Sequence, residues 1–152
     1  MKYWLMKSEP STFSIDDLQR RPGKTEHWDG VRNYQARNFM RDAMRPNDLA
    51  FFYHSSCDIP GIAGIIEIAR GAYPDFTAWD PKSDYRDSNS TPDKPIWYMV
   101  DVRFKRELAR VIPLAELKGN RALKDMLLLR RGTRLSIQPV TAREWNAILA
   151  ME

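Results

Sequence analysis

A short run, residues 28–38, combines side-chain types that proteins use to recognise nucleotides. Aromatic rings stack on nucleobases, amides form hydrogen bonds with base edges, and guanidinium groups hold phosphates. Trp28 precedes the turn dipeptide Asp29-Gly30, so we expect its indole on a loop just before a helix. The residues of the run that carry this chemistry are Trp28, Arg32, Asn33, Tyr34, Arg37 and Asn38. Their combination suggests nucleotide binding.

Members of the run also have structural interpretations. Trp28 could be a partly exposed packing residue, and Asn33 is well placed to cap the helix that follows. Asn38 lies about one turn further on, where an amide adds nothing to helix propensity, so it is the more suggestive of the two. A structural hydrogen bond explains Asn38 equally well. Residue types alone therefore leave binding and structural roles open.

Three arginines at four-residue spacing, Arg37, Arg41 and Arg45, share one face of the helix predicted over residues 33–44. Most basic faces of this kind are simply solvated. The alternative is a track for a phosphate backbone, in which case binding weakens as the salt concentration rises. The stripe is therefore a candidate phosphate contact. We expect it to have this role only if the neighbouring aromatic residues bind bases.

The trio Lys7-Ser8-Glu9 is the one compact group that resembles catalytic equipment, because a lysine can activate a hydroxyl and a carboxylate can orient it. Polar clusters at strand ends are common without catalysis, so we predict no catalytic residues. His27 and His54 have no carboxylate at a metal-motif spacing, and neither belongs to a recognisable triad. We expect no metal and no cofactor.

The composition is typical of one globular domain over residues 1–152, with 24 Lys and Arg against 20 Asp and Glu and a net charge of +4. The excess is mild, so the distribution of charge matters more than its total. The single cysteine, Cys57, cannot form an intramolecular disulfide, and the first apolar stretch is too short for a signal peptide or a membrane span. We expect a cytoplasmic protein, nuclear in a eukaryote, that does not bind membranes.

The elements that must position these side chains follow from the spacing of apolar residues. Five strands are predicted, over residues 3–6, 49–54, 62–68, 96–104 and 134–140. Helices are predicted from Ser14 to about Arg21 and over residues 33–44, 113–117, 122–129 and 141–149. Loops are expected at 24–27 and 72–95, and Gly64 permits a bend or a close backbone approach within its strand. The pattern indicates an α+β fold that is compatible with a small barrel.

Segments spread along the whole chain resemble the EVE domain family. The matching motifs are Tyr3–Pro10, Trp28–Asn38, Phe52–Ser55, Pro60–Gly64 and Leu135–Pro139. The resemblance implies a single EVE domain over residues 1–152 with a PUA-like α+β fold. That fold is a small, partly closed mixed β barrel of about five to six strands with surrounding helices. It also implies kinship with the YTH and ASCH domains.

The same resemblance implies a non-enzymatic reader of modified bases, in particular 5-methylcytosine and its oxidised forms. The expected partner is nucleic acid, with DNA favoured over RNA, and the protein is taken to be a monomer. The base would be flipped into a pocket of aromatic and amide side chains. The pocket positions that it implies are Ser8, Trp28, Asn33, Asn38, Tyr53, Trp79, Tyr85, Ser136 and Gln138, of which Trp79 and Tyr85 are the weaker candidates. Phosphate contacts are expected from Arg32, Arg37 and Arg41.

Two other functions remain open at this point. One is an amidohydrolase acting on a modified nucleoside, motivated by Lys7-Ser8-Glu9 and by the related ASCH group. The other is a small-ligand or protein-interaction module whose basic stripe is merely solvated. For a reader, burial of one additional methyl group contributes only about 0.8 kcal/mol, roughly a fourfold preference. Stronger discrimination requires shape or hydrogen bonds that penalise the unmodified base.

Overall fold

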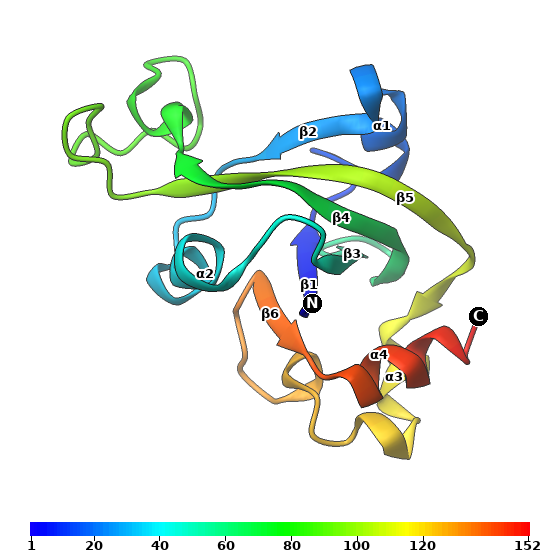
Figure 1. Cartoon of the computed structure of the whole chain (residues 1–152). Coiled ribbons are helices and arrows are strands. Elements are labelled where there is room, and N and C mark those ends of the chain that lie inside the picture. The colour runs from blue at the N-terminus through cyan, green and yellow to red at the C-terminus, as the bar shows by residue number, and fades with distance from the viewer.

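The computed structural model describes all residues 1–152 and is built on one six-stranded mixed sheet flanked by short helices (Figure 1). The strands are β1 Tyr3–Ser8, β2 Thr25–Trp28, β3 Leu49–His54, β4 Gly61–Pro74, β5 Tyr98–Pro113 and β6 Ile137–Val140. They lie in the order β2-β5-β4-β3-β1-β6. β1 and β3 are parallel, and the other neighbouring strands are antiparallel. The sheet does not close, because the edge strands β2 and β6 do not pair with each other.

The long strands β4 and β5 bend the sheet. Their pairing shifts register at several points, one of them between Ile62 and Gly64. A Cβ on Gly64 would come within 2.8 Å of the Ile15 side chain and 2.9 Å of the Arg106 carbonyl oxygen. The close approach predicted for Gly64 is therefore confirmed, since only a residue without a side chain leaves room for both neighbours.

Four short helices cover the sheet: α1 Ile15–Arg20, α2 Tyr34–Asn38, α3 Leu114–Lys118 and α4 Ala142–Leu149. The predicted capping boxes are confirmed, because Ser14 with Asp17 and Thr141 with Glu144 satisfy the first backbone groups of α1 and α4. His54 Nε2 also accepts a hydrogen bond from the Ile15 N–H at 3.2 Å. None of the helices is long and apolar enough to cross a membrane.

Two hydrophobic clusters lie on the two faces of the sheet. The first contains residues from both edge strands, Trp28 of β2 and Ile137 of β6, together with side chains of α1 and α2. The second packs β3 and β5 against α3, α4 and the chain between them. It includes Phe51, whose ring is stacked on that of Trp145 with 3.9 Å between the ring centres. Because one cluster includes both edges, the sheet curves around it as a partly closed barrel. The predicted α+β fold is confirmed.

The predicted loop over residues 24–27 is wrong, because Thr25–Trp28 forms β2. This edge strand pairs with β5, so that Trp28 lies opposite Val100. Its first three residues are polar and carry little strand signal. The strand therefore depends on a partner more than 70 residues away in the chain, which local sequence does not reveal.

Several other elements differ from the prediction in length or type. The helix expected over 33–44 ends at Asn38, and Phe39–Ala43 forms a wider π-helical turn in which the Met44 N–H donates to the Phe39 carbonyl. Residues 122–129 form two 3₁₀ turns rather than one helix. The strands predicted over 62–68 and 96–104 are longer than expected, and the last strand begins at Ile137. Tertiary pairing and packing override local periodicity at these element ends.

Candidate functional site

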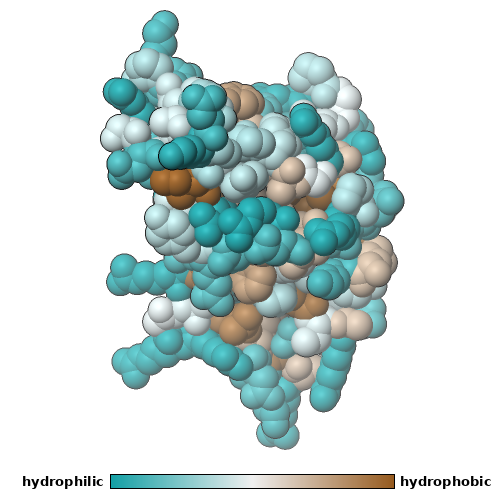
Figure 2. Space-filling view, turned by 60° about the vertical axis from the view of Figure 1, so that its left-hand side comes forward, coloured by the Kyte–Doolittle hydropathy of each residue, from teal (hydrophilic) through white to brown (hydrophobic).

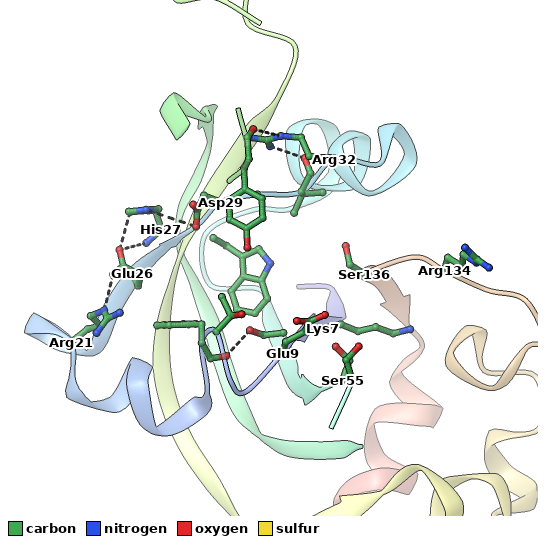
Figure 3. A pocket seen from close by; sticks show the side chains of 18 residues that line it. Lys7, Glu9, Arg21, Glu26, His27, Asp29, Arg32, Ser55, Arg134 and Ser136 are labelled. Carbon is green, nitrogen blue, oxygen red and sulfur yellow. Dashed lines mark hydrogen bonds and ion pairs between the residues drawn. The ribbon is translucent and has the colours of Figure 1, made fainter. Parts of the chain in front are cut away.

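A cavity of about 650 Å³ opens where β1 and β3 end, beside the start of β6 (Figure 3). β2 and the turn after it form another wall, and Tyr85 reaches the cavity from the long loop between β4 and β5. The lining residues include Lys7, Ser8, Glu9, Glu26, His27, Trp28, Asp29, Gly30, Arg32, Ser55, Tyr85, Arg134 and Ser136. Segments far apart in the sequence therefore meet at one hollow.

Trp28 forms an aromatic wall of the cavity. It is the last residue of β2, and its ring meets Phe52 edge-on at 5.4 Å between ring centres. The side chain is 7% exposed and belongs to the first hydrophobic cluster. Trp28 therefore both packs the core and lines the cavity, and it lies at a strand end instead of the loop predicted for it.

Tyr85 lies over the turn that follows β2. Gly30 has a φ of +81°, and a Cβ built there would come within 2.8 Å of the Tyr85 ring. Glycine is required twice over, by the left-handed backbone and by the contact with the ring. Tyr85 is 38% exposed, so its ring keeps a solvent-facing surface beside the cavity.

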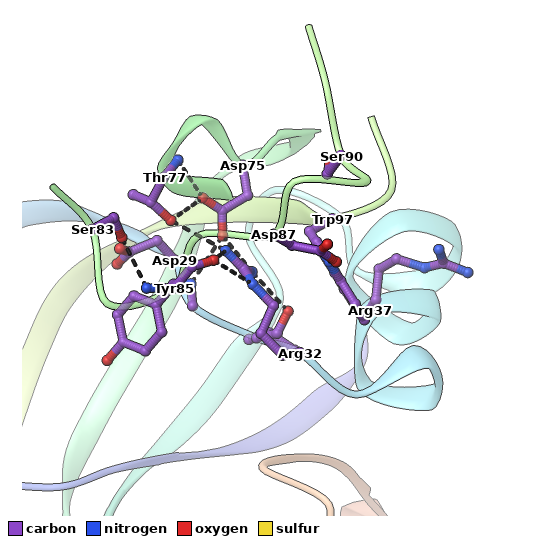
Figure 4. Close-up of polar contacts among 12 residues, drawn as sticks. Asp29, Arg32, Arg37, Asp75, Thr77, Ser83, Tyr85, Asp87, Ser90 and Trp97 are labelled. Atoms are coloured by element: carbon purple, nitrogen blue, oxygen red, sulfur yellow. Dashed lines mark hydrogen bonds and ion pairs between the residues drawn. The ribbon is translucent and has the colours of Figure 1, made fainter. Parts of the chain in front are cut away.

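Arg32 fastens the Tyr85 loop to the turn (Figure 4). Its Nε and Nη2 donate to the Tyr85 carbonyl at 2.9 and 2.7 Å, and Nη1 donates to Asp75 Oδ2 and the Val31 carbonyl, each at 3.0 Å. Nη2 also donates to Thr77 Oγ1 at 3.3 Å. All five N–H groups of the guanidinium are thus engaged within the protein. A phosphate contact, expected of Arg32 from the sequence, would require breaking these bonds.

Asp75 is the fixed acceptor at the centre of this arrangement and is fully buried. Its carboxylate also accepts from the Gly30 N–H at 2.9 Å and from both the N–H and the hydroxyl of Thr77. A buried carboxylate is stable only when it is paired and hydrogen-bonded in this way. The turn at Gly30 and the loop carrying Tyr85 are therefore held by one shared anchor.

An acidic side of the cavity is formed by Asp29 and Glu26, with His27 between them (Figure 3). His27 Nδ1 lies 2.8 Å from Glu26 Oε1, and its Nε2 lies 3.9 Å from Asp29 Oδ1. Burial raises the pKa of the Asp29 carboxyl above its ordinary value. A carboxylate at this place can accept a hydrogen bond from an amino group of a ligand. No group of three or more His, Cys, Asp or Glu side chains is arranged to hold a metal ion.

In the trio Lys7-Ser8-Glu9, the side chains of Lys7 and Ser8 have different partners. Lys7 and Ser8 alternate along β1, and the Ser8 hydroxyl donates to the Phe13 carbonyl at 2.6 Å, whereas the Lys7 ammonium lies 5.9 Å from the centre of the Tyr53 ring. Burial lowers the pKa of Lys7. The lysine and the hydroxyl therefore point to different surroundings, although both residues line the cavity.

Of the predicted pocket residues, Ser8, Trp28, Tyr85 and Ser136 line this cavity. Tyr53 and Gln138 do not, and Tyr53 packs in the second cluster, on the other face of the sheet. Gln138 is 1% exposed and donates to the Leu135 carbonyl at 3.0 Å. Alternation along a strand identifies opposite faces but not which face borders a cavity, so the sequence could not separate these residues.

The remaining predicted pocket residues also lie outside the cavity. Asn33 is the cap of α2, with Oδ1 accepting from the Ala36 N–H at 3.0 Å. Asn38 accepts from the Arg37 guanidinium at 2.8 and 3.1 Å. Trp79 is half-buried at the end of a 3₁₀ turn. The structural interpretations of both asparagines thus account for their contacts.

The arginine stripe is largely compensated within the protein. Arg41 pairs with Asp42 at 2.8 Å, and Arg45 donates to the Met44 and Asp42 carbonyls. Arg37 donates to the Ile96 carbonyl at 2.9 Å as well as to Asn38. The guanidiniums that sequence spacing singled out therefore have internal partners.

Sequence reasoning missed several of the lining residues, among them Asp29, Gly30 and Arg134. Asp29 and Gly30 were interpreted only as a turn, although their place next to Trp28 was a signal that they share its surroundings. Arg134 follows the pair Arg130-Arg131, a basic cluster that is visible in the sequence. Arg134 could not be connected to the cavity without knowing that β6 starts beside the end of β1.

Comparisons with known proteins agree with this architecture. The family model of the EVE domain matches residues 2–151. Thymocyte nuclear protein 1 of Homo sapiens is 48% identical over 167 residues, covering 99% of this chain and 73% of that protein.

Solved structures are similar over almost the whole chain. A protein from Pseudomonas syringae has 54% sequence identity and a TM-score of 0.94, with 98% of each chain covered. The human THYN1 protein, solved in complex with 5-methylcytosine-containing DNA, has 48% identity and a TM-score of 0.94, covering 99% of this chain and 97% of that one. Family model, sequence and structure agree, and the chain belongs to the EVE domain family.

Proposed function

We propose that this protein binds DNA that carries a modified cytosine and holds the flipped base in the cavity beside Trp28. The observation that carries the proposal is the union of two aromatic side chains and a carboxylate, Trp28, Tyr85 and Asp29, around one cavity of about 650 Å³. The human THYN1 protein, similar over nearly the whole chain, is known in complex with 5-methylcytosine-containing DNA.

Each group has a defined part in the proposed complex. The rings of Trp28 and Tyr85 contact the base, which offsets part of the few kcal/mol needed to unstack it. Asp29 accepts a hydrogen bond from the exocyclic amino group, the donor that distinguishes cytosine from thymine. The hydroxyl oxygens of Ser8 and Ser136 supply further polar contacts from the opposite wall.

The cavity is proposed to bind without catalysing a reaction. A hydrolase needs a nucleophile within hydrogen-bond reach of a base. The Ser8 hydroxyl instead donates to the Phe13 carbonyl, and Lys7 lies against Tyr53. This separation argues against the amidohydrolase alternative. We further propose that the protein is a single domain and acts as a monomer. It would act where the DNA is, in the cytoplasm or the nucleus.

The test is a titration of matched duplexes that differ only in one central 5-methylcytosine. We expect tighter binding to the methylated duplex, and we expect Tyr85→Ala to weaken binding about tenfold, because base stacking contributes roughly 1–3 kcal/mol. Tyr34→Ala is the matched control, since Tyr34 is 59% exposed and does not line the cavity. Equal affinity for both duplexes, with no loss in Tyr85→Ala, would contradict the proposal.

A second arm separates a reader from an enzyme. Purified protein is incubated with N-acylated cytidines, and the release of free cytidine is followed by chromatography. No turnover is expected. Turnover in the wild type that disappears in Lys7→Ala would instead establish the amidohydrolase.

A further inference from the structure

The net positive charge of the chain comes from one segment, residues 118–134, which is termed the basic segment. It contains six basic residues and one acidic residue, Asp125, a net of +5, whereas the whole chain carries +4. The remainder of the protein is therefore slightly acidic. The six basic residues are Lys118, Arg121, Lys124, Arg130, Arg131 and Arg134, and all are exposed.

These side chains have no partners in the protein. None of the six forms an ion pair with a carboxylate within 4.0 Å or a side-chain hydrogen bond, in contrast to Arg41 and Arg45 of the stripe. Figure 2 shows hydrophilic side chains projecting at the lower end of the molecule, the end at which the basic segment lies in Figure 1. Unpaired guanidinium groups are free to bind an external anion, with several N–H donors available to each.

The end of the basic segment is a fixed turn at the mouth of the cavity. The Thr133 N–H donates to the Arg130 carbonyl at 3.3 Å, and Gly132 has a φ of +79°. This is the third position of the turn, where a positive φ favours glycine. Two residues beyond Arg134, the Ser136 carbonyl accepts from the Lys7 N–H at 2.8 Å, which ties the turn to β1.

Two cations border the cavity on this side. Arg134 and Lys7 both line it, and in Figure 3 their charged ends extend to the same side of Ser136. The opposite side carries Asp29 and Glu26. The cavity thus has an acidic wall suited to an amino group and a basic wall suited to phosphate.

We infer that Arg130, Arg131 and Arg134 of this turn, together with Lys7, bind the backbone phosphates that flank the base held in the cavity. The inference rests on the proposed function and adds to it the place and polarity of the phosphate contacts. Arginine is suited to this role because its planar fork binds phosphate through two parallel N–H bonds. The phosphate track therefore lies on the turn before β6 rather than on the stripe of Arg37, Arg41 and Arg45.

The salt dependence of DNA binding tests this inference. Removing one phosphate contact lowers the slope of log affinity against log salt by about 0.9. We expect Arg130→Gln/Arg131→Gln/Arg134→Gln to lower the slope by about 2–3. The preference for the methylated duplex should be retained, because phosphate contacts do not read the base.

The matched control removes the same charge elsewhere. Arg70→Gln/Arg103→Gln/Arg143→Gln replaces three exposed arginines that do not line the cavity. Its slope is expected to match that of the wild type, because the variant removes no phosphate contact. If the triple variant of the turn melts early, the single variants Arg130→Gln and Arg131→Gln are measured, each with an expected slope change of about 0.9.

The outcomes separate this inference from the proposed function. A turn variant with the slope of the control overturns the phosphate track, and a wild type that still prefers the methylated duplex leaves the base cavity standing. Failure of the wild type to bind either duplex at low salt overturns both.

Discussion

The Tyr85 ring lies directly against Gly30, so closely that a Cβ on Gly30 would come within 2.8 Å of it. The contact joins the turn after β2 to a residue 55 positions further along the chain. Arg32 strengthens the junction by donating twice to the Tyr85 carbonyl. The position of the Tyr85 ring beside the cavity thus depends on a glycine and on an arginine whose donors are all engaged within the protein.

Gly30→Ala is expected to displace the Tyr85 ring and weaken DNA binding to the level of Tyr85→Ala. The substitution also places alanine at a φ of +81°, which costs about 1–2 kcal/mol in folding free energy. Gly23→Ala is the control, because Gly23 has a φ of +62° and a Cβ there would meet only Thr25 Oγ1, at 4.0 Å. Urea denaturation and duplex titration check both variants, and equal effects would refute the ring contact.

Arg32→Lys is expected to destabilise the protein even though it retains the charge. Lysine cannot reproduce the fork that reaches Asp75, Thr77 and the Tyr85 carbonyl together, and it leaves fully buried Asp75 short of partners. We expect a loss of about 2 kcal/mol, seen as a melting temperature lower by roughly 4–8 °C. Arg41→Lys, on the exposed stripe, should melt like the wild type. An unchanged melting temperature in Arg32→Lys would show that these contacts of the Arg32 guanidinium do not stabilise the fold.

Asp29 predicts a pH dependence of binding. Burial raises the pKa of this carboxyl above 3.8, so on acidification it takes up its proton at a higher pH than an exposed carboxyl does. The protonated group accepts a hydrogen bond from an amino group poorly, and affinity should therefore fall as the pH drops through the raised pKa. Titrations at successive pH values check this.

Asp29→Asn should abolish that pH dependence and weaken binding at pH 7 by about tenfold or more, in line with a loss of about 1.5–3 kcal/mol for a hydrogen bond to a charged group. Asp93→Asn, in the exposed part of the long loop, provides the control. A pH profile of Asp29→Asn that coincides with the wild type would show that another group titrates.

Glu152 predicts a change in stability at acidic pH. Its carboxylate accepts from the Arg106 guanidinium at 2.5 and 2.7 Å and from the Ala109 N–H at 3.1 Å, and the Arg106 contact above all lowers its pKa to about 2. The lower pKa belongs to the folded state, so the stabilisation is present above pH 4.5 and is lost as the pH falls toward 2.

Glu152→Gln should therefore be less stable than the wild type at pH 7 by about 1 kcal/mol, since solvent screens a pair whose arginine is 46% exposed. The two proteins should converge as the pH approaches 2. Glu116→Gln, at a more exposed pair with Arg110, is expected to change less. Denaturation at both pH values checks the difference, and a constant gap would show that protonation of Glu152 is not responsible.

Much of the fold could be predicted from local sequence. The apolar runs of β1 and β3 and the capping boxes at Ser14 and Thr141 are defined by residues within a few positions of one another. The motif around Trp28 indicated nucleotide chemistry because its residues, too, lie within a few positions of one another. Secondary structure of this kind needs no distant partner, because short-range hydrogen bonds and side-chain periodicity specify it.

The cavity itself was decided by tertiary structure. The edge strand β2 exists because it pairs with β5, and the ring of Tyr85 lines the cavity because Arg32 and Asp75 hold its loop. The sequence does not distinguish Tyr53 from a pocket residue. The pairing of β3 with β1 and the packing of the sheet place Tyr53 in the second hydrophobic cluster.

The sequence by itself determined the α+β composition, the family motifs and the polar chemistry around Trp28. Only the tertiary structure decided which of those side chains meet, and it shows that the arginines of the stripe have internal partners whereas those of the turn before β6 have none. The physical reason is that contacts between distant segments depend on which apolar faces are buried together. Local propensity contains no information about that pairing.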